Sequence, residues 1–285
     1  MSKTEKDLQA SELANWAAAV MRIAEEAGTL IMEVYTAEGE LEVEHKSDDS
    51  PLTLADRRAH LYIEKALTQL TPSIPILSEE SESLPYAQRS TWQRYWLVDP
   101  LDGTKEFISR NGEFTVNIAL IEGSAAILGV VHVPVSKVSY TGFLSPQGRK
   151  ASKWQDGEET ELSTARAGEQ PIRVVASRRH GGERLEALLG RIAKEHALAD
   201  VISIGSSLKM CLVAEGSADV YPRLAPTSEW DTAAAHAVLC AAGGDIVGLD
   251  FRSLQYNQKD SLLNPEFIAL GDRDFDWQRL LIMTE

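Results

Sequence analysis

The stretch YWLVDPLDGTKEF, Tyr95–Phe107, predicts a buried strand whose end carries chemistry. Its short apolar run, bounded by turn residues, is typical of such a strand and ends in Asp99 and Asp102, followed by Gly103 and Thr104. Burying a carboxylate is costly without a cation or hydrogen-bond donors. The two acids therefore suggest a divalent cation, Mg²⁺, that holds a phosphate. For this stretch alone, an Asx-rich turn with solvated acids stays the favoured alternative.

A second strand that ends in carboxylates precedes this stretch. In PSIPILSEESES the apolar residues Ile74–Leu77 predict a short strand, which Glu79 and Glu80 follow. Further upstream, Thr53 and Asp56 lie at the predicted first turn of a helix, where capping is the favoured interpretation of the isolated pair. Two such strand ends together with Asp56 indicate a site.

The rest of the first half is predicted as scaffold. Apolar residues at three- and four-residue steps predict a long helix over Leu8–Tyr35, and Leu41 and Val43 alternate with acids as in an edge strand. A polar loop, 46–51, leads to the second helix. Three later runs predict strands in an antiparallel meander, namely Phe114–Ile121, Ala125–Val135 and Lys137–Leu144.

The pattern changes after Ser145–Gln170, a polar segment that predicts a surface hairpin or loop, a domain boundary and no function of its own. Beyond it, strands and helices alternate, which favours a mainly parallel sheet covered by helices. The predicted strands are Ile172–Ala176, Val201–Ile204, Ala218–Tyr221, Ile246–Leu249 and Phe267–Leu270, and the predicted helices are Ser207–Glu215, Thr232–Ala242 and one around Leu185 to Ile192.

Polar residues again follow the predicted strands of the second half. In open α/β sheets ligands bind beyond the carboxyl ends of strands. There Ser206 or Ser207 with Lys209 could cradle a phosphate, although without context an ordinary N-cap with a solvated lysine is favoured. Asp231 opens an alanine-rich helix, where the helix dipole favours an acid in any case.

The composition bounds the class of protein. At 285 residues the chain can bury the core of one large domain or of two halves. Its formal net charge of −15 argues against nucleic-acid polymers as partners, because phosphate backbones need a basic surface. The charged amino terminus lacks the apolar core of a secretory signal, and no apolar run reaches the length of a membrane span. Cys211 and Cys240 lack metal-type spacing and are predicted to be reduced core residues.

Three motifs in this order give the chain a resemblance to a known family: ILSEES, DPLDGTKEF and WDTAAAHAVL. Together they resemble the inositol monophosphatase superfamily of metal-dependent phosphatases, and within it the bacterial 3′(2′),5′-bisphosphate nucleotidases. The resemblance implies an α+β layered αβαβα sandwich with the active site between two halves, 1–168 and 169–285. The first half would hold an antiparallel sheet with two helices, and the second a mostly parallel sheet with helices.

The resemblance also implies a set of metal ligands. Glu79, Asp99 and the carbonyl of Leu101 would hold one Mg²⁺. A second Mg²⁺ would bind to Asp99, Asp102 and Asp231, and a third, held more weakly, would contact Glu79. Hard oxygen ligands of this kind suit Mg²⁺, and paired cations can stabilise both the attacking and the leaving oxygen.

The resemblance gives Asp56 a catalytic role with Thr104. This pair would orient the attacking water and help to deprotonate it, in a reaction to which Glu79 also contributes through its metal. In that context catalytic support replaces capping as the favoured role of Asp56. Glu80 and Thr53 would support the site without binding metal directly.

Substrate recognition follows from the same resemblance. The residues expected to contact an adenosine bisphosphate are His180, Ser206, Lys209 and Arg223. The positively charged side chains of Lys209 and Arg223 would neutralise the phosphate that is retained. The remaining expected substrate contacts are Glu79, Leu101, Asp102, Gly103, Thr104 and Asp231.

The implied activity is the Mg²⁺-dependent removal of the 3′-phosphate of adenosine 3′,5′-bisphosphate, which gives AMP and phosphate. With 3′-phosphoadenylyl sulfate as a second substrate, the enzyme would belong to sulfur assimilation. The alternatives that stay open are a phosphatase of inositol monophosphate or fructose 1,6-bisphosphate, and a non-catalytic nucleotide sensor. The expected location is the cytoplasm. Peripheral association with the inner membrane, as in some relatives, stays open, although no feature of the sequence supports strong anchoring.

The other histidines have no spacing typical of zinc ligands and are predicted to serve at the surface or in packing. They are His45, His60, His132, His196 and His236.

Overall fold

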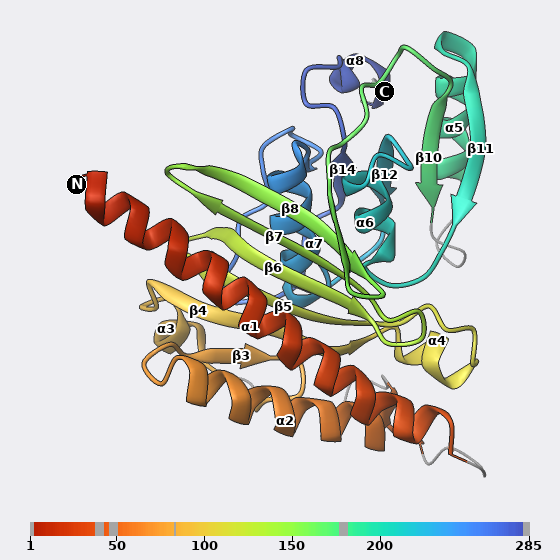
Figure 1. The fold of residues 1–285 in the computed structure, drawn as a ribbon. Helices are drawn as coiled ribbons and strands as arrows, with labels where there is room; N and C mark the ends of the chain where they lie inside the picture. Colours follow the sequence, from red (N-terminus) through yellow and green to blue (C-terminus); the bar gives the residue numbers. More distant parts are fainter. Residues whose placement is uncertain (1–2, 38–42, 46–50, 83, 177–181, 282–285) are drawn as a thin grey trace.

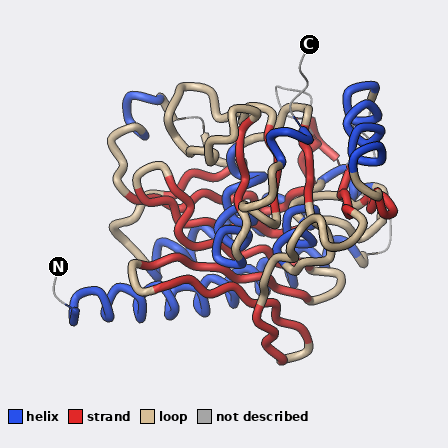
Figure 2. Tube along the Cα trace, turned by 90° about the horizontal axis from the view of Figure 1, so that it is seen from above, coloured by secondary structure: helices blue, strands red, loops and turns tan. Residues whose placement is uncertain are grey.

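The structure, a computed structural model, describes residues 3–37, 43–45, 51–82, 84–176 and 182–281. Within these residues helices and sheets alternate in five layers, which Figures 1 and 2 show from two directions. The predicted layered α+β sandwich is therefore confirmed. In the described part of the chain, no helix has the length and apolar character needed to cross a membrane.

Two helices form the first layer, α1 (Lys3–Tyr35) and α2 (Leu54–Leu70). Both pack on one face of a seven-stranded sheet. Its order is β3 (Ile76–Ser78), β4 (Arg94–Asp102), β5 (Thr115–Glu122), β6 (Ala125–Val133), β7 (Val138–Ser145), β8 (Gly148–Gln155) and β9 (Glu158–Glu161). The β3–β4 pair is parallel and the others are antiparallel, so the predicted meander is confirmed.

The polar segment 145–170 contributes more than a loop. It forms the hairpin β8–β9, which extends the meander by two strands, so the hairpin alternative is the correct one. A short ribbon of β1 (Val43–His45) and β2 (Pro51–Thr53) precedes α2, so Pro51 belongs to a strand and not to the predicted loop. Leu41 and residues 46–50 lie outside the described residues.

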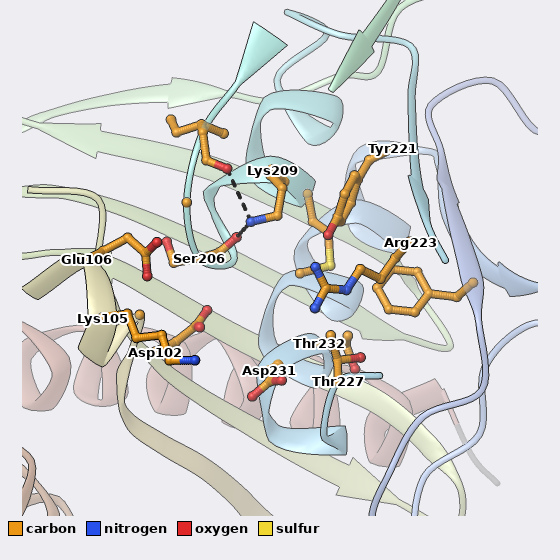
Figure 3. A pocket seen from close by; sticks show the side chains of 15 residues that line it. Asp102, Lys105, Glu106, Ser206, Lys209, Tyr221, Arg223, Thr227, Asp231 and Thr232 are labelled. Carbon is orange, nitrogen blue, oxygen red and sulfur yellow. Dashed lines mark hydrogen bonds between the residues drawn. The ribbon is translucent and has the colours of Figure 1, made fainter. Parts of the chain in front are cut away.

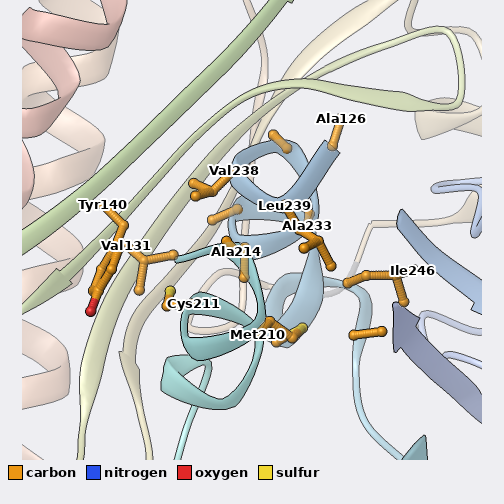
Figure 4. Packing of buried hydrophobic residues seen from close by; sticks show 14 of the residues in the cluster. Ala126, Val131, Tyr140, Met210, Cys211, Ala214, Ala233, Val238, Leu239 and Ile246 are labelled. Carbon is orange, nitrogen blue, oxygen red and sulfur yellow. The ribbon is translucent and has the colours of Figure 1, made fainter. Parts of the chain in front are cut away.

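The middle layer consists of α6 (Leu208–Ala214) and α7 (Glu229–Ala242), between the two sheets. Figure 4 shows Val131 of the first sheet together with Met210 and Val238 of these helices, which belong to one buried hydrophobic cluster. The alanine-rich α7 approaches the first sheet closely. A Cβ atom on Gly129 or Gly142 would lie 2.0 Å from the carbonyl oxygen of Ala234 or 2.5 Å from the Cα of Val238. This close packing fixes the head of α7, where Asp231 lies.

The second sheet has the order β11 (Leu198–Ser203), β10 (Ile172–Ala176), β12 (Val220–Arg223), β14 (Phe267–Leu270) and β13 (Asp245–Gly248). Four of these described strands run in one direction and β14 runs against them, so the mostly parallel sheet is confirmed with β14 as its exception. The outer layer is α5 (Glu183–Glu195) with α8 (Trp277–Leu281). Neighbouring residues of β10 serve different layers, since Val174 packs towards α5 and α8 while Val175 packs towards α6 and α7.

Candidate active site

The end of β4 differs from the predicted strand-then-turn. The strand continues to Asp102, with a break in its pairing to β5 between Asp99 and Asp102. The backbone N–H of Leu101 donates to Asp99 Oδ1 at 3.0 Å, which is the expected Asx-type contact. Asp99, however, is only 1% exposed, so the alternative of solvated acids is wrong for this residue. This irregular pairing directs Asp99 and Asp102 to the same site. Gly103, with φ of 95°, is the N-cap of the short helix α4 (Thr104–Ile108).

Three aspartates from two distant parts of the chain converge. Asp99 and Asp102 come from β4, and Asp231 comes from the first turn of α7. One carboxylate oxygen from each lies within 4.8 Å of the others. Asp231 is held by a capping box, in which its Oδ2 accepts from the N–H of Ser228 at 2.8 Å. The predicted helix started three residues too late, because the sequence pattern did not show this cap.

The electrostatics of these acids favour a bound cation. Burial, together with the charges of Glu79, Asp102 and Asp231, raises the pKa of Asp99 well above its ordinary value. Burial and the charge of Asp102 likewise raise the pKa of Asp231. Glu79 is half-buried, and its N–H donates to the carbonyl of Val98 at 3.0 Å, which holds it beside β4. These converging oxygens fit one or more divalent cations.

Asp56 caps a helix and contacts Thr104 at the same time. Its Oδ2 accepts from the N–H of Thr53 at 2.7 Å and from the Thr53 hydroxyl at 2.5 Å, which makes it a helix cap. Its Oδ1 accepts from the hydroxyl of Thr104 at 3.3 Å. Burial raises the pKa of Asp56, although the bonds from Thr53 oppose this, and the charge of Glu80 adds to the rise. One oxygen is therefore fixed by the helix while the other faces Thr104.

A pocket of about 190 Å³ adjoins the acids. Figure 3 shows Asp102 and Asp231 on one side and Lys209, Tyr221 and Arg223 on the other. Sequence reasoning missed several further lining residues, because only the packing of α4, α6, α7, β14 and the loops beside them brings these residues together. They are Lys105, Glu106, Ile204, Met210, Thr227, Thr232 and Phe267.

Lys209 is buried, so the alternative of a solvated lysine is wrong. Its Nζ donates to the carbonyl of Ser206 at 2.6 Å and lies 5.6 Å from the centre of the Tyr221 ring. Burial lowers the pKa of Lys209 to about 8, against the opposing charge of Asp102. Arg223 lies beside it and donates from Nε to the carbonyl of Ala225 at 3.1 Å. Two cationic groups thus line a pocket that the acids also enter.

Ser206 faces the same pocket in a strained conformation, with φ of 46°. Its hydroxyl is buried, and no described residue forms a hydrogen bond with it. A buried hydroxyl without a partner is costly, so this atom fits a contact to a ligand. His180, the remaining residue expected on this side, lies outside the described residues.

A second group of metal-ligand types lies further along α7. His236, Cys240 and Asp245 converge within 4.8 Å, which the sequence spacing did not indicate. Here Asp245 Oδ1 already accepts from His236 Nε2 at 2.9 Å, from the N–H of Ile246 at 2.8 Å and from Ser253 Oγ at 2.9 Å. These donors satisfy the carboxylate without a metal. Both cysteines are free, Cys211 buried and Cys240 partly exposed.

The predicted packing role of His236 is confirmed, since it is buried and bonded to Tyr256 and Asp245. Three other histidines also contact neighbouring side chains: His60 with Ser78, His132 with Ser139, and His196 with Phe275. The side chain of His45 is outside the described part of the chain.

Comparison with known proteins gives the chain its relatives. It is 50% identical over 248 residues to the 3′(2′),5′-bisphosphate nucleotidase CysQ of Salmonella typhimurium, covering 87% of this chain and 96% of that protein. The protein of the same name from Escherichia coli strain K12 is 48% identical with the same coverage.

Among solved structures, CysQ from Bacteroides thetaiotaomicron is 41% identical with a TM-score of 0.78, over 92% of this chain and 98% of that one. The extragenic suppressor protein suhB of Bartonella henselae, at 22% identity and a TM-score of 0.74, shares the fold over 94% of this chain and 98% of its own. Residues 12–273 match the sequence profile of the inositol monophosphatase family. The chain therefore belongs to the inositol monophosphatase family.

Proposed function

We propose that this chain is a Mg²⁺-dependent 3′(2′),5′-bisphosphate nucleotidase. It would remove the 3′-phosphate of adenosine 3′,5′-bisphosphate to give AMP and phosphate, and it would accept 3′-phosphoadenylyl sulfate in sulfur assimilation. The observation that carries the proposal is one pocket in which Asp102 and Asp231, which converge with the buried Asp99, line the same space as two cationic side chains, Lys209 and Arg223. The names of its relatives at about 50% identity support the same activity.

Enzymes of this family depend on metal ions. In this chain Glu79, Asp99, Asp102, Asp231 and the carbonyl of Leu101 would hold two Mg²⁺, with a third at Glu79. When bound, the ions would supply positive charge that neutralises the buried acids and polarises the phosphate. The raised pKa values of Asp99 and Asp231 express the same need for positive charge.

Asp56 and Thr104 would move the proton of the attacking water. Thr104 Oγ1 would accept this proton while its own passes to Asp56 Oδ1, the oxygen that the helix cap leaves available. A burial-raised pKa suits Asp56 for accepting the proton. As the new bond to phosphorus forms, the bond to the 3′-oxygen would break, and that oxygen would take up a proton from solvent water to leave AMP, while Asp56 would return its proton to solvent. Thr53 and Glu80 would support Asp56 through a hydrogen bond and through charge.

The second half would provide the specificity. Lys209 and Arg223 would neutralise the phosphate that stays on the nucleotide. The hydroxyl of Ser206, which has no hydrogen-bond partner among the described residues, would donate to that phosphate or to the ribose. We also assign His180 to this side on family resemblance. The division into halves 1–168 and 169–285 would then separate most metal ligands from most substrate contacts.

The test is phosphate release from a panel of substrates, with Mg²⁺ and with EDTA. We expect the highest kcat/KM for adenosine 3′,5′-bisphosphate and no release in EDTA. A higher kcat/KM for inositol monophosphate or fructose 1,6-bisphosphate would replace the substrate assignment. Absence of release with Mg²⁺ on every substrate, together with nucleotide binding, would identify a non-catalytic sensor instead.

A further inference from the structure

Asp102 is held by residues from both halves of the molecule. Its Oδ2 accepts from the N–H of Ser207 at 2.6 Å and from the hydroxyl of Ser207 at 2.7 Å. Asn117, on β5, donates to the same oxygen from Nδ2 at 3.3 Å. The neighbouring Thr115 hydroxyl adds a longer bond of 3.4 Å. Within the described residues, all these donors bond to one oxygen of Asp102, Oδ2, and none of these bonds involves Oδ1.

The donors themselves are fixed. Ser207 and Asn117 are each 1% exposed, although both are polar. Asn117 Nδ2 also donates to Ser207 Oγ at 2.9 Å, and its Oδ1 accepts from the Thr115 hydroxyl at 3.0 Å. These bonds determine which way the amide of Asn117 faces, so the carboxylate of Asp102 meets a rigid set of donors.

Ser207 also connects these donors to Asp231, the expected metal ligand at the start of α7. Its hydroxyl oxygen lies 2.6 Å from the carbonyl oxygen of Asp231 as well as 2.7 Å from Asp102 Oδ2. One hydroxyl proton therefore serves two acceptors, one on each of two expected metal ligands. The loop before α6 is clamped in the same region, since the N–H of Gly205 donates to Glu113 Oε2 at 2.7 Å. Ser207 thus touches Asp102 of the first half and the backbone of Asp231 in the second.

Residues that form hydrogen bonds with metal-ligand side chains orient those side chains and thereby affect the affinity for the metal. We propose that Ser207, supported by Asn117, is a positioning residue that orients Oδ1 of Asp102 for a divalent cation and keeps Asp102 in register with Asp231. This inference rests on the metal site of the proposed function. It assigns Ser207 to metal binding rather than to the phosphate contact that the sequence left open for Ser206 or Ser207.

The test measures Mn²⁺ binding directly, from the electron paramagnetic resonance signal of free Mn²⁺, with no nucleotide present. Ser207→Ala should weaken the tightest Mn²⁺ site about 10- to 100-fold. The Mg²⁺ concentration for half-maximal activity should rise to a similar extent, and kcat should recover at saturating Mg²⁺. A purely structural defect would not be rescued by metal.

Ser152 provides a matched control. It is also 1% exposed and donates to a carboxylate, Glu159 Oε1, at 2.7 Å, but it lies on β8 away from the pocket. Ser152→Ala should leave the Mn²⁺ affinity unchanged. Equal losses in both variants would overturn the inference, as would an unchanged affinity in Ser207→Ala.

Asn117→Ala is the second variant, for the case in which Ser207→Ala does not fold. It removes one donor to Asp102 and one to Ser207 while the N–H of Ser207 remains, so the loss should be about tenfold. An unchanged Mn²⁺ affinity in Asn117→Ala would contradict the proposal. Mn²⁺ binding is measured without substrate, so the two proposals can fail separately. If the protein hydrolyses bisphosphates but the variants bind Mn²⁺ as tightly as the original protein, only this inference is refuted. Altered binding without bisphosphate hydrolysis would refute only the proposed substrate.

Discussion

Two groups of potential metal ligands lie along the same helix, α7, and they differ in how their charges are balanced. Near its start, Asp231 meets Asp99 and Asp102; further along, His236 and Cys240 of α7 meet Asp245. The first group consists of carboxylates, and burial with mutual repulsion raises the pKa of Asp99 and Asp231. In the second, burial also acts to raise the pKa of Asp245, but the bonds and charge of its donors hold that pKa below its ordinary value.

The difference shows that proximity of ligand types does not by itself make a metal site. Asp245 accepts bonds from His236, Ile246 and Ser253, so its negative charge is compensated by the protein. At the other group, the donors to Asp102 all take one oxygen, and the acids remain close to one another. We therefore interpret the first group as catalytic and the second as a structural network that anchors α7.

The largest expected difference appears when an aspartate in each group is replaced by asparagine. Asp102→Asn should lower turnover about a thousandfold or more, because loss of a metal ligand removes several kcal/mol of charge stabilisation. Asp245→Asn should destabilise the protein but leave kcat of the folded fraction within about twofold. Steady-state kinetics with Mg²⁺ titration, together with thermal unfolding, measures both. A near-normal kcat of Asp102→Asn at saturating Mg²⁺ would show that turnover requires the carboxylate of Asp102 no more than that of Asp245.

A smaller loss is expected at Thr104. Thr104→Val keeps the shape of the side chain but removes the hydroxyl that bonds to Asp56, and kcat should fall about a hundredfold with little change in KM. Thr71→Val is the control, since the Thr71 hydroxyl also takes part in a side-chain hydrogen bond, accepting from Trp96 Nε1 at 2.8 Å at the C-cap of α2. It should reduce stability only. Similar kcat values for both variants would remove Thr104 from proton transfer.

The cationic side of the pocket should show a graded effect. Lys209→Met should lower kcat/KM for adenosine 3′,5′-bisphosphate about 10- to 100-fold, since charge-assisted hydrogen bonds contribute about 1.5–3 kcal/mol. Simple phosphate monoesters should be affected less. Lys153→Met, which breaks an ion pair with Glu215 outside the pocket, is the control. Equal losses on both substrate types would make Lys209 structural.

Lys209 also predicts a pH dependence. Its pKa of about 8 means that the ammonium group is lost as the pH rises past 8, so KM for the bisphosphate should increase there. For folding the sign is opposite: the unfolded lysine keeps its proton up to about 10.5, so the cost of burying the charge is full below pH 8 and disappears as the pH rises towards 10.5. The KM–pH profile of Lys209→Met should lack the rise above pH 8.

The smallest effect is expected at Cys240. Its Sγ lies 3.6 Å from Asp245 Oδ1, where stronger donors already bind. Cys240→Ala should therefore change the free energy of unfolding by about 1 kcal/mol or less and leave the Mg²⁺ requirement unaltered. Thermal unfolding with and without added Zn²⁺ provides the measurement. A Zn²⁺-dependent stabilisation that Cys240→Ala abolishes would turn the structural network into a metal site.

Several elements of the site follow from local sequence. The apolar run before Asp99 and the one before Glu79 predict strands that end in acids, and β3 and β4 confirm both. For Ser207 the local pattern indicates a phosphate contact or an ordinary N-cap, because nothing in it shows that the hydroxyl reaches Asp102. A polar Thr115 and Asn117 within an apolar alternating strand were the available signal, since buried polar groups need partners.

The sequence by itself determined the periodicities that make α1, the meander and the alternating second half, as well as the family through three ordered motifs. Spacing and burial patterns are local, so they can be read along the chain. Only the tertiary structure decided which oxygen of Asp56 serves the helix and which faces Thr104, and why Asp231 and Asp245 on and beside one helix have opposite pKa shifts. Those outcomes depend on donors from distant segments, which only the packed layers bring together.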